Sequence, residues 1–342
     1  MSETTLNGAS QQEEATTRSP SRIARIFASI VLLRESRVGM VGVALVLFWV
    51  SMALLATLNT ILVDAGLLQV GIVFPPNATL APLMPPLSDF IVRAGSLVNE
   101  APVEEICSLI ASGENEGSYH CGTFWLGTDH LGRDIWARIF YGSQTVLTWA
   151  PIATICAYAV GIPMGLAAGY KGGWVDDFLS FISNIILSFP VLVLFILFIT
   201  LVGASAINIV VAITFASAPG IMRIVRGLTL DLRTREYVFA AQTRGEPTWW
   251  ILFVEILPNA RGPLIVDSML RLGYVIITVG VLGFLGLGLP PPNPDWGGMI
   301  NETRQMAMSF PWMTVFPCLA ISSLVLGFNL LADGLREVSM RD

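Results

Sequence analysis

The sequence predicts an all-α protein that crosses a membrane about six times. Of its 342 residues, 54% are hydrophobic and only 13% are charged, whereas an ordinary soluble domain is about a quarter charged. Its mean hydropathy is +0.69. A chain with so few charged residues cannot cover a soluble protein of this size with a polar surface. We therefore expect lipid to surround much of it.

Uncharged apolar runs of about 20 residues, the length that spans a bilayer as a helix, recur along the chain. The run at residues 178–222 is too long for one span, and we expect a helical hairpin that bends near Gly203. Continuous runs favour helices over a β-barrel, whose strands would show short alternating segments. The other four spans are expected at residues 38–58, 146–168, 264–289 and 312–332.

Lys and Arg residues are unequally divided between the two sides of the membrane that these spans define. With the N-terminus inside, inside segments hold 14 of them and outside segments hold four. Cytoplasmic loops carry an excess of Lys and Arg, so both termini are expected in the cytoplasm. The expected order is a cytoplasmic tail at 1–37, a first transmembrane helix at 38–58, a periplasmic loop at 59–145, a transmembrane core at 146–335 and a cytoplasmic C-terminus at 336–342.

The outside segment at 59–145 is too long for a passive connector, which favours a docking role. We expect an ordered loop with little regular structure and a short helix at about 102–112. Cys107 and Cys121 both fall in this loop. An oxidising compartment would allow them to form a disulfide, and two free thiols are the alternative.

The inside segment at 223–261 is rich in arginine. A helix is expected within it, because Thr234 can cap it and Glu236 would lie in its first turn. Gly245 is well placed to end this helix, and Pro247 prevents its continuation. A basic amphipathic connector that lies on the inner leaflet is one interpretation of such a segment.

A second interpretation comes from the order of small residues in this segment. Ala240 and Ala241, three further residues, Gly245 and a downstream pair, Leu257 and Pro258, resemble the EAA loop of binding-protein-dependent ABC importer permeases. In that family the helix is a coupling helix, seated in a groove of a cytoplasmic ATPase subunit. The resemblance implies this role for these five residues and favours it over the membrane-surface connector.

The match departs from the family pattern at Phe239, where the motif has a glutamate. Glu236 lies one turn earlier and is the candidate to replace that carboxylate in the coupling helix. Three further stretches, at 127–134, 188–190 and 284–297, look like the peptide/nickel class of these permeases, the C-type partner of a pair. Together and in order, they narrow the resemblance to that class.

The resemblance implies the type I ABC importer permease fold in a bacterial inner membrane. It also implies a second, homologous permease that completes the translocation pathway, two cytoplasmic ATPase subunits that hold ATP and Mg²⁺, and a periplasmic solute-binding protein. Peptides or related small solutes are the implied cargo, and no nucleic acid is expected as a partner.

The sequence gives no support to catalysis by this chain. Its only lysine is Lys171, and no phosphate-binding Gly-x-x-x-x-Gly-Lys-Ser/Thr motif is present. No Ser/His/Asp arrangement or metal-ligand cluster stands out. We therefore expect that the chain itself binds no cofactor or metal and is not an enzyme.

Residues near the outside surface are candidates for docking a binding protein or the partner permease, or for an outer gate. For the charged residues we favour another interpretation, a salt-bridged turn at the membrane interface. For the glycine- and proline-rich stretch that follows the fifth span, a rigid turn is as compatible with the sequence as a gate. The candidates are Asp129, Arg133, Asp134, Trp296 and Gly297.

Polar side chains within the spans are candidates for lining a pathway, although such residues usually bond between helices. These candidates are Asn184, Ser188 and Thr278. Asp267 and Arg271 lie four residues apart on the fifth span and can pair on one helix face. We expect them to lie close enough to the inner surface to reach toward it, and we favour a structural role over a pathway-lining one.

Two other functions compete with the importer permease. An ion-gradient-driven secondary transporter would need ionisable residues at the midplane or broken helices in repeated halves. The spans hold one Asp–Arg pair and no detectable repeat. A membrane-bound scaffold or enzyme without transport is the third possibility, and co-purification with ATPase subunits would separate the three.

Overall fold

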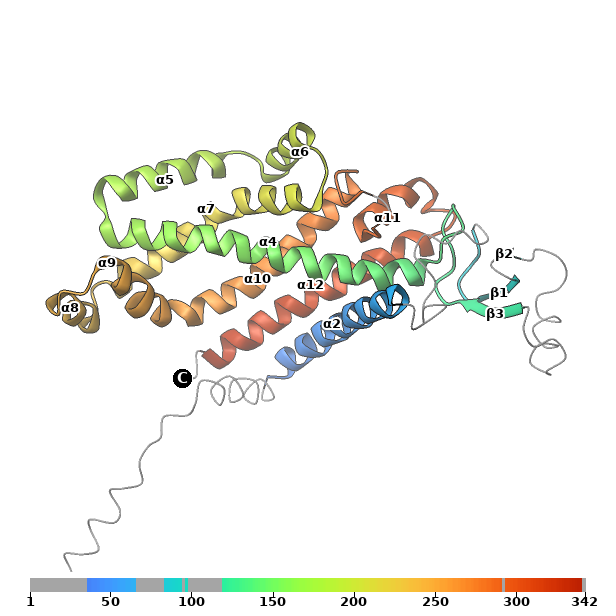
Figure 1. Cartoon of the computed structure of the whole chain (residues 1–342), viewed down its shortest axis with the longest axis horizontal. Coiled ribbons are helices and arrows are strands. Elements are labelled where there is room, and N and C mark those ends of the chain that lie inside the picture. The colour runs from blue at the N-terminus through green and yellow to red at the C-terminus, as the bar shows by residue number, and fades with distance from the viewer. Residues whose placement is uncertain (1–35, 66–82, 94–95, 98–118, 291–292, 340–342) are drawn as a thin grey trace, which may run out of the picture.

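A computed structural model describes residues 36–65, 83–93, 96–97, 119–290 and 293–339, and Figure 1 shows an elongated helical bundle. Long helices run along its length, which confirms the predicted all-α membrane class. They are α2 (Arg37–Asp64), α4 (Ile135–Lys171), α7 (Ala206–Leu232), α10 (Leu257–Phe284) and α12 (Trp312–Ser339).

Five helical stretches in the described part of the chain are long and apolar enough to cross a membrane, and a bent pair can supply a sixth. That pair is α5 (Gly173–Ser188) and α6 (Val191–Val202), whose axes differ by 88°. Phe189 is extended between them, because Pro190 disfavours helical geometry in the residue before it. The expected turn near Gly203 is present, but the first arm of the expected hairpin is broken rather than straight.

Two of the membrane-crossing helices begin earlier than the apolar runs within them. The helix that contains the run at 146–168 starts at Ile135, because Asp134 caps α4 there. The helix that contains the fifth apolar run is continuous from Thr248, through α9 (Thr248–Trp250) and the π-helical turn η2 (Ile251–Ile256) into α10. Pro258 and Pro263 lie inside this stretch, so the rule that a proline ends a helix fails here.

A small antiparallel sheet extends beyond one end of the bundle (Figure 1). Its strands are β1 (Ser88–Arg93), β2 (Ser96–Leu97) and β3 (Tyr119–Phe124), in the order β2-β1-β3. The expectation of little regular structure in this loop was therefore wrong for the strands. The expected helix at 102–112 and Cys107 lie outside the described residues, so the disulfide with Cys121 stays a prediction.

Close contact between α4 and α7 organises the centre of the bundle. Glycines recur on α4 at every fourth position, where they let the backbone of α7 approach, as small residues do between membrane helices. A Cβ added at Gly165 would lie 2.5 Å from the Cβ of Val225. The glycines of this face are Gly161, Gly165 and Gly169.

Candidate functional site

The short helix α8 (Glu236–Thr243) projects at the end of the bundle opposite the sheet (Figure 1). Val238 and Ala241 are fully buried on one face and pack in an apolar cluster that includes residues of η2. Phe239 and Ala240 lie on the exposed face, where Phe239 is 55% accessible to solvent. The helix is therefore attached by one face and open on the other.

The predicted ends of α8 are half right. At the C-terminal end, Gly245 has a positive φ of 78°, its N–H donates to the Gln242 carbonyl at 2.9 Å, and the Glu246 N–H donates to the Ala241 carbonyl at 3.2 Å. This pairing ends a helix with glycine. At the N-terminal end the predicted cap is wrong. The Thr234 hydroxyl donates to the Asp231 carbonyl at 2.8 Å, and the residue at the N-cap position is Arg235.

Leu257 and Pro258 begin α10 on the far side of η2 from α8. Leu257 packs against the same apolar cluster that holds Ala241, so the structure brings the two halves of the sequence motif together. Pro258 is exposed and lines a shallow cavity of about 340 Å³ with Leu257 and Phe253. Glu236 is exposed in the first turn of α8.

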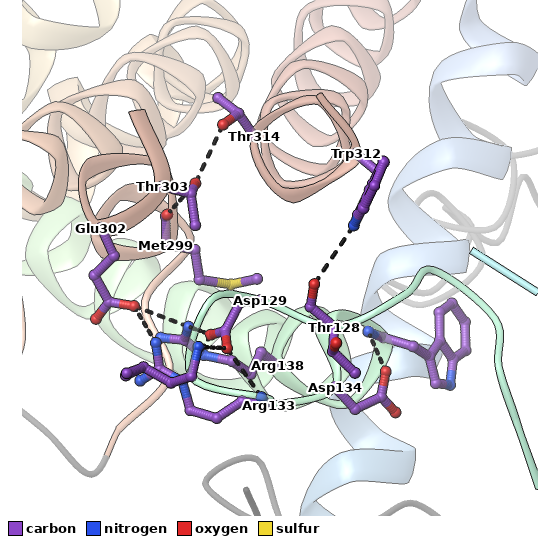
Figure 2. Close-up of polar contacts among 12 residues, drawn as sticks. Thr128, Asp129, Arg133, Asp134, Arg138, Met299, Glu302, Thr303, Trp312 and Thr314 are labelled. Carbon is purple, nitrogen blue, oxygen red and sulfur yellow. Dashed lines mark hydrogen bonds and ion pairs between the residues drawn. The ribbon is translucent and has the colours of Figure 1, made fainter. Parts of the chain in front are cut away.

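At the opposite end, the turn before α4 is held by buried charges (Figure 2). The Asp129 side chain is 2% exposed, and its Oδ2 accepts hydrogen bonds from Arg133 Nε at 2.7 Å and Arg138 Nη1 at 2.9 Å. Its Oδ1 accepts from the backbone N–H groups of Leu131 and Arg133, each at 2.9 Å. Asp129 thus pairs with two arginines and also bonds to the backbone of the turn.

Glu302 completes this network from the short helix α11 (Trp296–Thr303) (Figure 2). It accepts from Arg138 Nη1 at 3.0 Å and also pairs with Arg133. Burial opposes ionisation of Glu302, but Arg138 and Arg133 together outweigh it and hold the pKa of its carboxyl below the usual value. Sequence reasoning missed Arg138 and Glu302, because residues 164 positions apart carry no local signal of contact.

Among the ion pairs of the described residues, none connects Asp134 to this network. Its Oδ1 accepts from the Trp136 backbone N–H at 3.0 Å and caps α4. Burial raises the pKa of Asp134 to about 6, against the lowering effect of that backbone bond. Asp129 and Arg133 therefore form an ion pair, whereas the third predicted charge is a helix cap.

Trp296 and Gly297 are buried and seat α11 against the long helices. The indole Nε1 of Trp296 donates to the Ile139 carbonyl at 3.1 Å. A Cβ added at Gly297 would lie 2.1 Å from the Gly280 carbonyl oxygen, so only glycine fits there. Asp295 caps α11 and accepts from the Gly297 N–H at 3.1 Å.

The pathway candidates are separated in the structure. Thr278 lines a cavity of about 360 Å³ between α4, α5, α6, α7 and α10. Asn184 lines a different cleft and accepts from Arg223 Nη2 at 2.7 Å. Ser188 is exposed and donates to the Ile185 carbonyl at 2.7 Å. Of the three, only Thr278 lines the cavity between α4, α5, α6, α7 and α10.

The expected pairing of Asp267 with Arg271 is confirmed, with 2.8 Å between Oδ2 and Nε. The hydroxyl of Tyr158 on α4 also donates to Asp267. Their expected position near the inner surface stays a prediction, because the continuous helix from Thr248 to Phe284 has 37 residues and is longer than the bilayer core. Arg271 lies 13 residues before Phe284, or about 20 Å along the axis.

Across the described residues, no cluster of three His, Cys, Asp or Glu side chains could hold a metal ion.

Comparison with known proteins adds independent information. Residues 161–341 match the family described as "Binding-protein-dependent transport system inner membrane component". The chain is 41% identical over 213 residues to the dipeptide transport system permease protein DppC of Alkalihalophilus pseudofirmus, which covers 62% of this chain and 70% of that protein. It is 41% identical over 223 residues to the glutathione transport system permease protein GsiD of Pectobacterium atrosepticum, covering 65% and 73%.

Among solved structures, an inward-facing form of the MetNI methionine ABC transporter is similar, with a TM-score of 0.47 and 21% sequence identity. That similarity covers 59% of this chain and 94% of the matched chain. The family match begins within α4 and includes α8 and the other coupling-motif residues of the sequence.

Proposed function

This chain belongs to the family of inner membrane components of binding-protein-dependent transport systems, and from this premise we propose that it lines one half of the solute pathway of an ATP-driven importer. A second, homologous permease would line the other half. Two cytoplasmic ATPase subunits would hold ATP and Mg²⁺, and a periplasmic binding protein would deliver the solute. Peptides or related small solutes are the proposed cargo, since similar proteins are named as dipeptide and glutathione permeases.

The observation that carries this proposal is the geometry of α8. A helix of eight residues is anchored through Val238 and Ala241, and its other face is open. The bias of Lys and Arg toward the inside segments supports a cytoplasmic position for α8 and for both termini. An ATPase subunit could then contact the exposed face directly.

Movement of α8 would reach the spans through packed side chains. Ala241 contacts the same cluster as Ile251 and Ile256 of η2, which continues without interruption into α10. Well-packed interiors transmit displacement because they contain little free volume. Closure of the ATPase dimer on ATP would therefore shift the segment Glu236–Gly245 as a lever and tilt the spans between inward-open and outward-open arrangements.

The exposed Phe239 defines the chemistry of the proposed ATPase groove. A phenylalanine ring 55% exposed on a short helix is suited to an apolar pocket rather than to a basic side chain. Glu236, one turn earlier and also exposed, would supply the carboxylate. The groove is thus proposed to combine an apolar pocket with a cation one turn away.

Purification in mild detergent separates the importer from the secondary transporter. We expect a second permease and a pair of ATPase subunits to accompany this chain. The break at Phe189 and Pro190 is the one bent pair among the described spans, and no second half repeats it. Solute uptake by the isolated chain, driven by an ion gradient without ATPase subunits, would contradict the proposal.

Gly245→Pro tests the role of α8. The substitution removes the N–H bonded to Gln242 and forbids the positive φ of this residue. We expect ATP hydrolysis by the reconstituted importer to persist while solute uptake is lost. Gly227→Ala is the control, since an added Cβ at Gly227 meets no atom within 4 Å. Uptake at the wild-type rate by Gly245→Pro would exclude the coupling role.

A further inference from the structure

The cavity between α4, α5, α6, α7 and α10 is partly open to the surface and has one strongly polar point. Its volume is about 360 Å³, at the lower end of the range for small-molecule sites. Most of the wall is apolar, including Phe195, Val275 and Ile277. Among the described residues that line it, Arg271 is the only one with a charge. Thr278 lies about two turns further along the same face of α10, and its hydroxyl donates to the Tyr274 carbonyl at 2.9 Å.

Arg271 is held so that one edge of its guanidinium group remains available. Its Nε is bonded to Asp267 at 2.8 Å, and Tyr158 donates to the same carboxylate oxygen. The Tyr158 hydroxyl also lies within hydrogen-bonding reach of the Arg271 guanidinium group. Beyond Asp267 and Tyr158, no further hydrogen-bond partner of that group is found among the described residues. Gly220 leaves room for the terminal nitrogens of Arg271, because a Cβ there would lie 3.3 Å from Nη1.

The pair is partly buried within a helix that can cross the membrane. The Arg271 and Asp267 side chains are 22% and 19% exposed, and both lie inside a span that runs from Thr248 to Phe284. Charged residues inside a span are costly and commonly mark a substrate pathway. Asp267 offsets the charge of Arg271, so the arginine can persist in the bundle before a solute arrives.

We propose that Arg271 binds a carboxylate group of the solute as it passes through this cavity. The inference rests on the proposed importer function and adds a residue that selects anionic cargo within the permease itself. Two N–H donors on one planar group suit a carboxylate, and the apolar wall suits the side chains of a small peptide. Because Asp267 already shares the arginine, binding would be weak enough for release.

Uptake of two matched probes by the reconstituted importer, with all its partner subunits, tests this site. The probes are the dipeptide alanyl-alanine and its C-terminal amide, which lacks the carboxylate. We expect the wild type to prefer the free acid by about tenfold, the size expected for a hydrogen bond to a charged group. In Arg271→Gln the preference should fall to near one, and Arg271→Lys should retain part of it.

A second variant avoids breaking the ion pair. Gly220→Ala keeps both charged residues but adds a methyl group 3.3 Å from Nη1 and 3.5 Å from Nη2 of Arg271, so the guanidinium group must shift by a few tenths of an ångström. We expect it to lose most of the preference for the free acid, whereas Gly227→Ala on the same helix should keep it. A wild-type preference retained in both Arg271→Gln and Gly220→Ala would overturn the carboxylate site, even with ATP-driven uptake intact.

Chemical modification provides a readout that does not depend on uptake. Phenylglyoxal reacts with accessible arginines, and peptide mass mapping of the purified complex measures the rate at Arg271. Alanyl-alanine at millimolar concentration should slow that rate more than its amide does. Equal rates with both probes would also overturn the site. Absence of ATPase subunits from the complex would instead contradict the proposed importer function.

Discussion

The two ends of the bundle hold their short helices in different ways. α11 is fixed by buried ion pairs and by close backbone contacts at its glycines. In contrast, α8 packs through apolar side chains on one face, and its other face is exposed. The Asp129 side chain beside α11 is 2% exposed, but in one of the ion pairs beside α8 the Arg235 and Asp231 side chains are 58% and 67% exposed. The ion pair of Asp129 with Arg138 is therefore shielded from water, and the pair of Arg235 with Asp231 is not.

This difference separates stability from contact with other molecules. Buried ion pairs with extra hydrogen bonds are strongly destabilising when one partner is removed, whereas exposed pairs contribute little. We therefore expect substitutions near α11 to affect folding, and substitutions on the open face of α8 to leave folding largely unchanged. The consequences can be tested in decreasing order of size.

Asp129→Asn should have the largest effect. It leaves Arg133 and Arg138 with Glu302 as their remaining carboxylate and costs about 3 kcal/mol of unfolding free energy. The matched control, Asp231→Asn, should cost no more than about 0.5 kcal/mol. Thermal unfolding of the detergent-solubilised protein, followed by tryptophan fluorescence, measures both. Equal losses of unfolding free energy in the two variants would contradict the proposed difference between the two ends of the bundle.

Gly297→Ala should have the next largest effect. Its new methyl group would meet the Gly280 carbonyl oxygen at 2.1 Å, and backbone cannot rotate away as a side chain could. Overpacking of this kind costs about 2 kcal/mol. The same unfolding assay applies, with Gly227→Ala as the control. A variant as stable as wild type would mean that α11 can move away from α10 at little cost.

The smallest effect is a pH dependence at Asp295. Burial raises the pKa of this residue from 3.8 to about 6, against the lowering effect of its backbone bonds. The folded state therefore holds a proton that the unfolded state has released between about pH 4 and pH 6, so this contribution to stability is present below that window and lost as the pH rises through about 6.

From about pH 5 to pH 7, this group alone should lower the unfolding free energy by about 1 kcal/mol. Asp295→Asn stays neutral and should reduce the slope of stability against pH. Part of the slope should remain, because the pKa of Asp134 is raised to about 6 in the same way. Unfolding measured at several pH values checks this, and an unchanged slope in the variant would contradict it.

Several local features were predictable because their causes are local. The apolar runs at 38–58 and 312–332 fall within α2 and α12. The end of α8 at Gly245 followed from the freedom of glycine to adopt a positive φ. The spacing of Asp267 and Arg271 placed them on one face of a helix. Each inference used residues only a few positions apart.

Other features depended on competition between local rules. Thr234 has the side chain of a helix cap, but its hydroxyl bonds to Asp231 at the end of α7 instead. Pro190 divides one expected span, whereas Pro258 and Pro263 leave another continuous. Pro258 lies at the first positions of α10, where a missing N–H costs little, whereas Phe189 before Pro190 is extended.

By itself, the sequence determined the membrane class, the approximate spans and the coupling motif, because composition, run length and short spacings act over one helix. Only the tertiary structure showed that Glu302 and Arg138 meet across 164 positions and that Gly220 on α7 makes room for Arg271 on α10. Such pairs depend on which helix faces approach each other. That choice is made by the packing of the whole bundle, and no single segment encodes it.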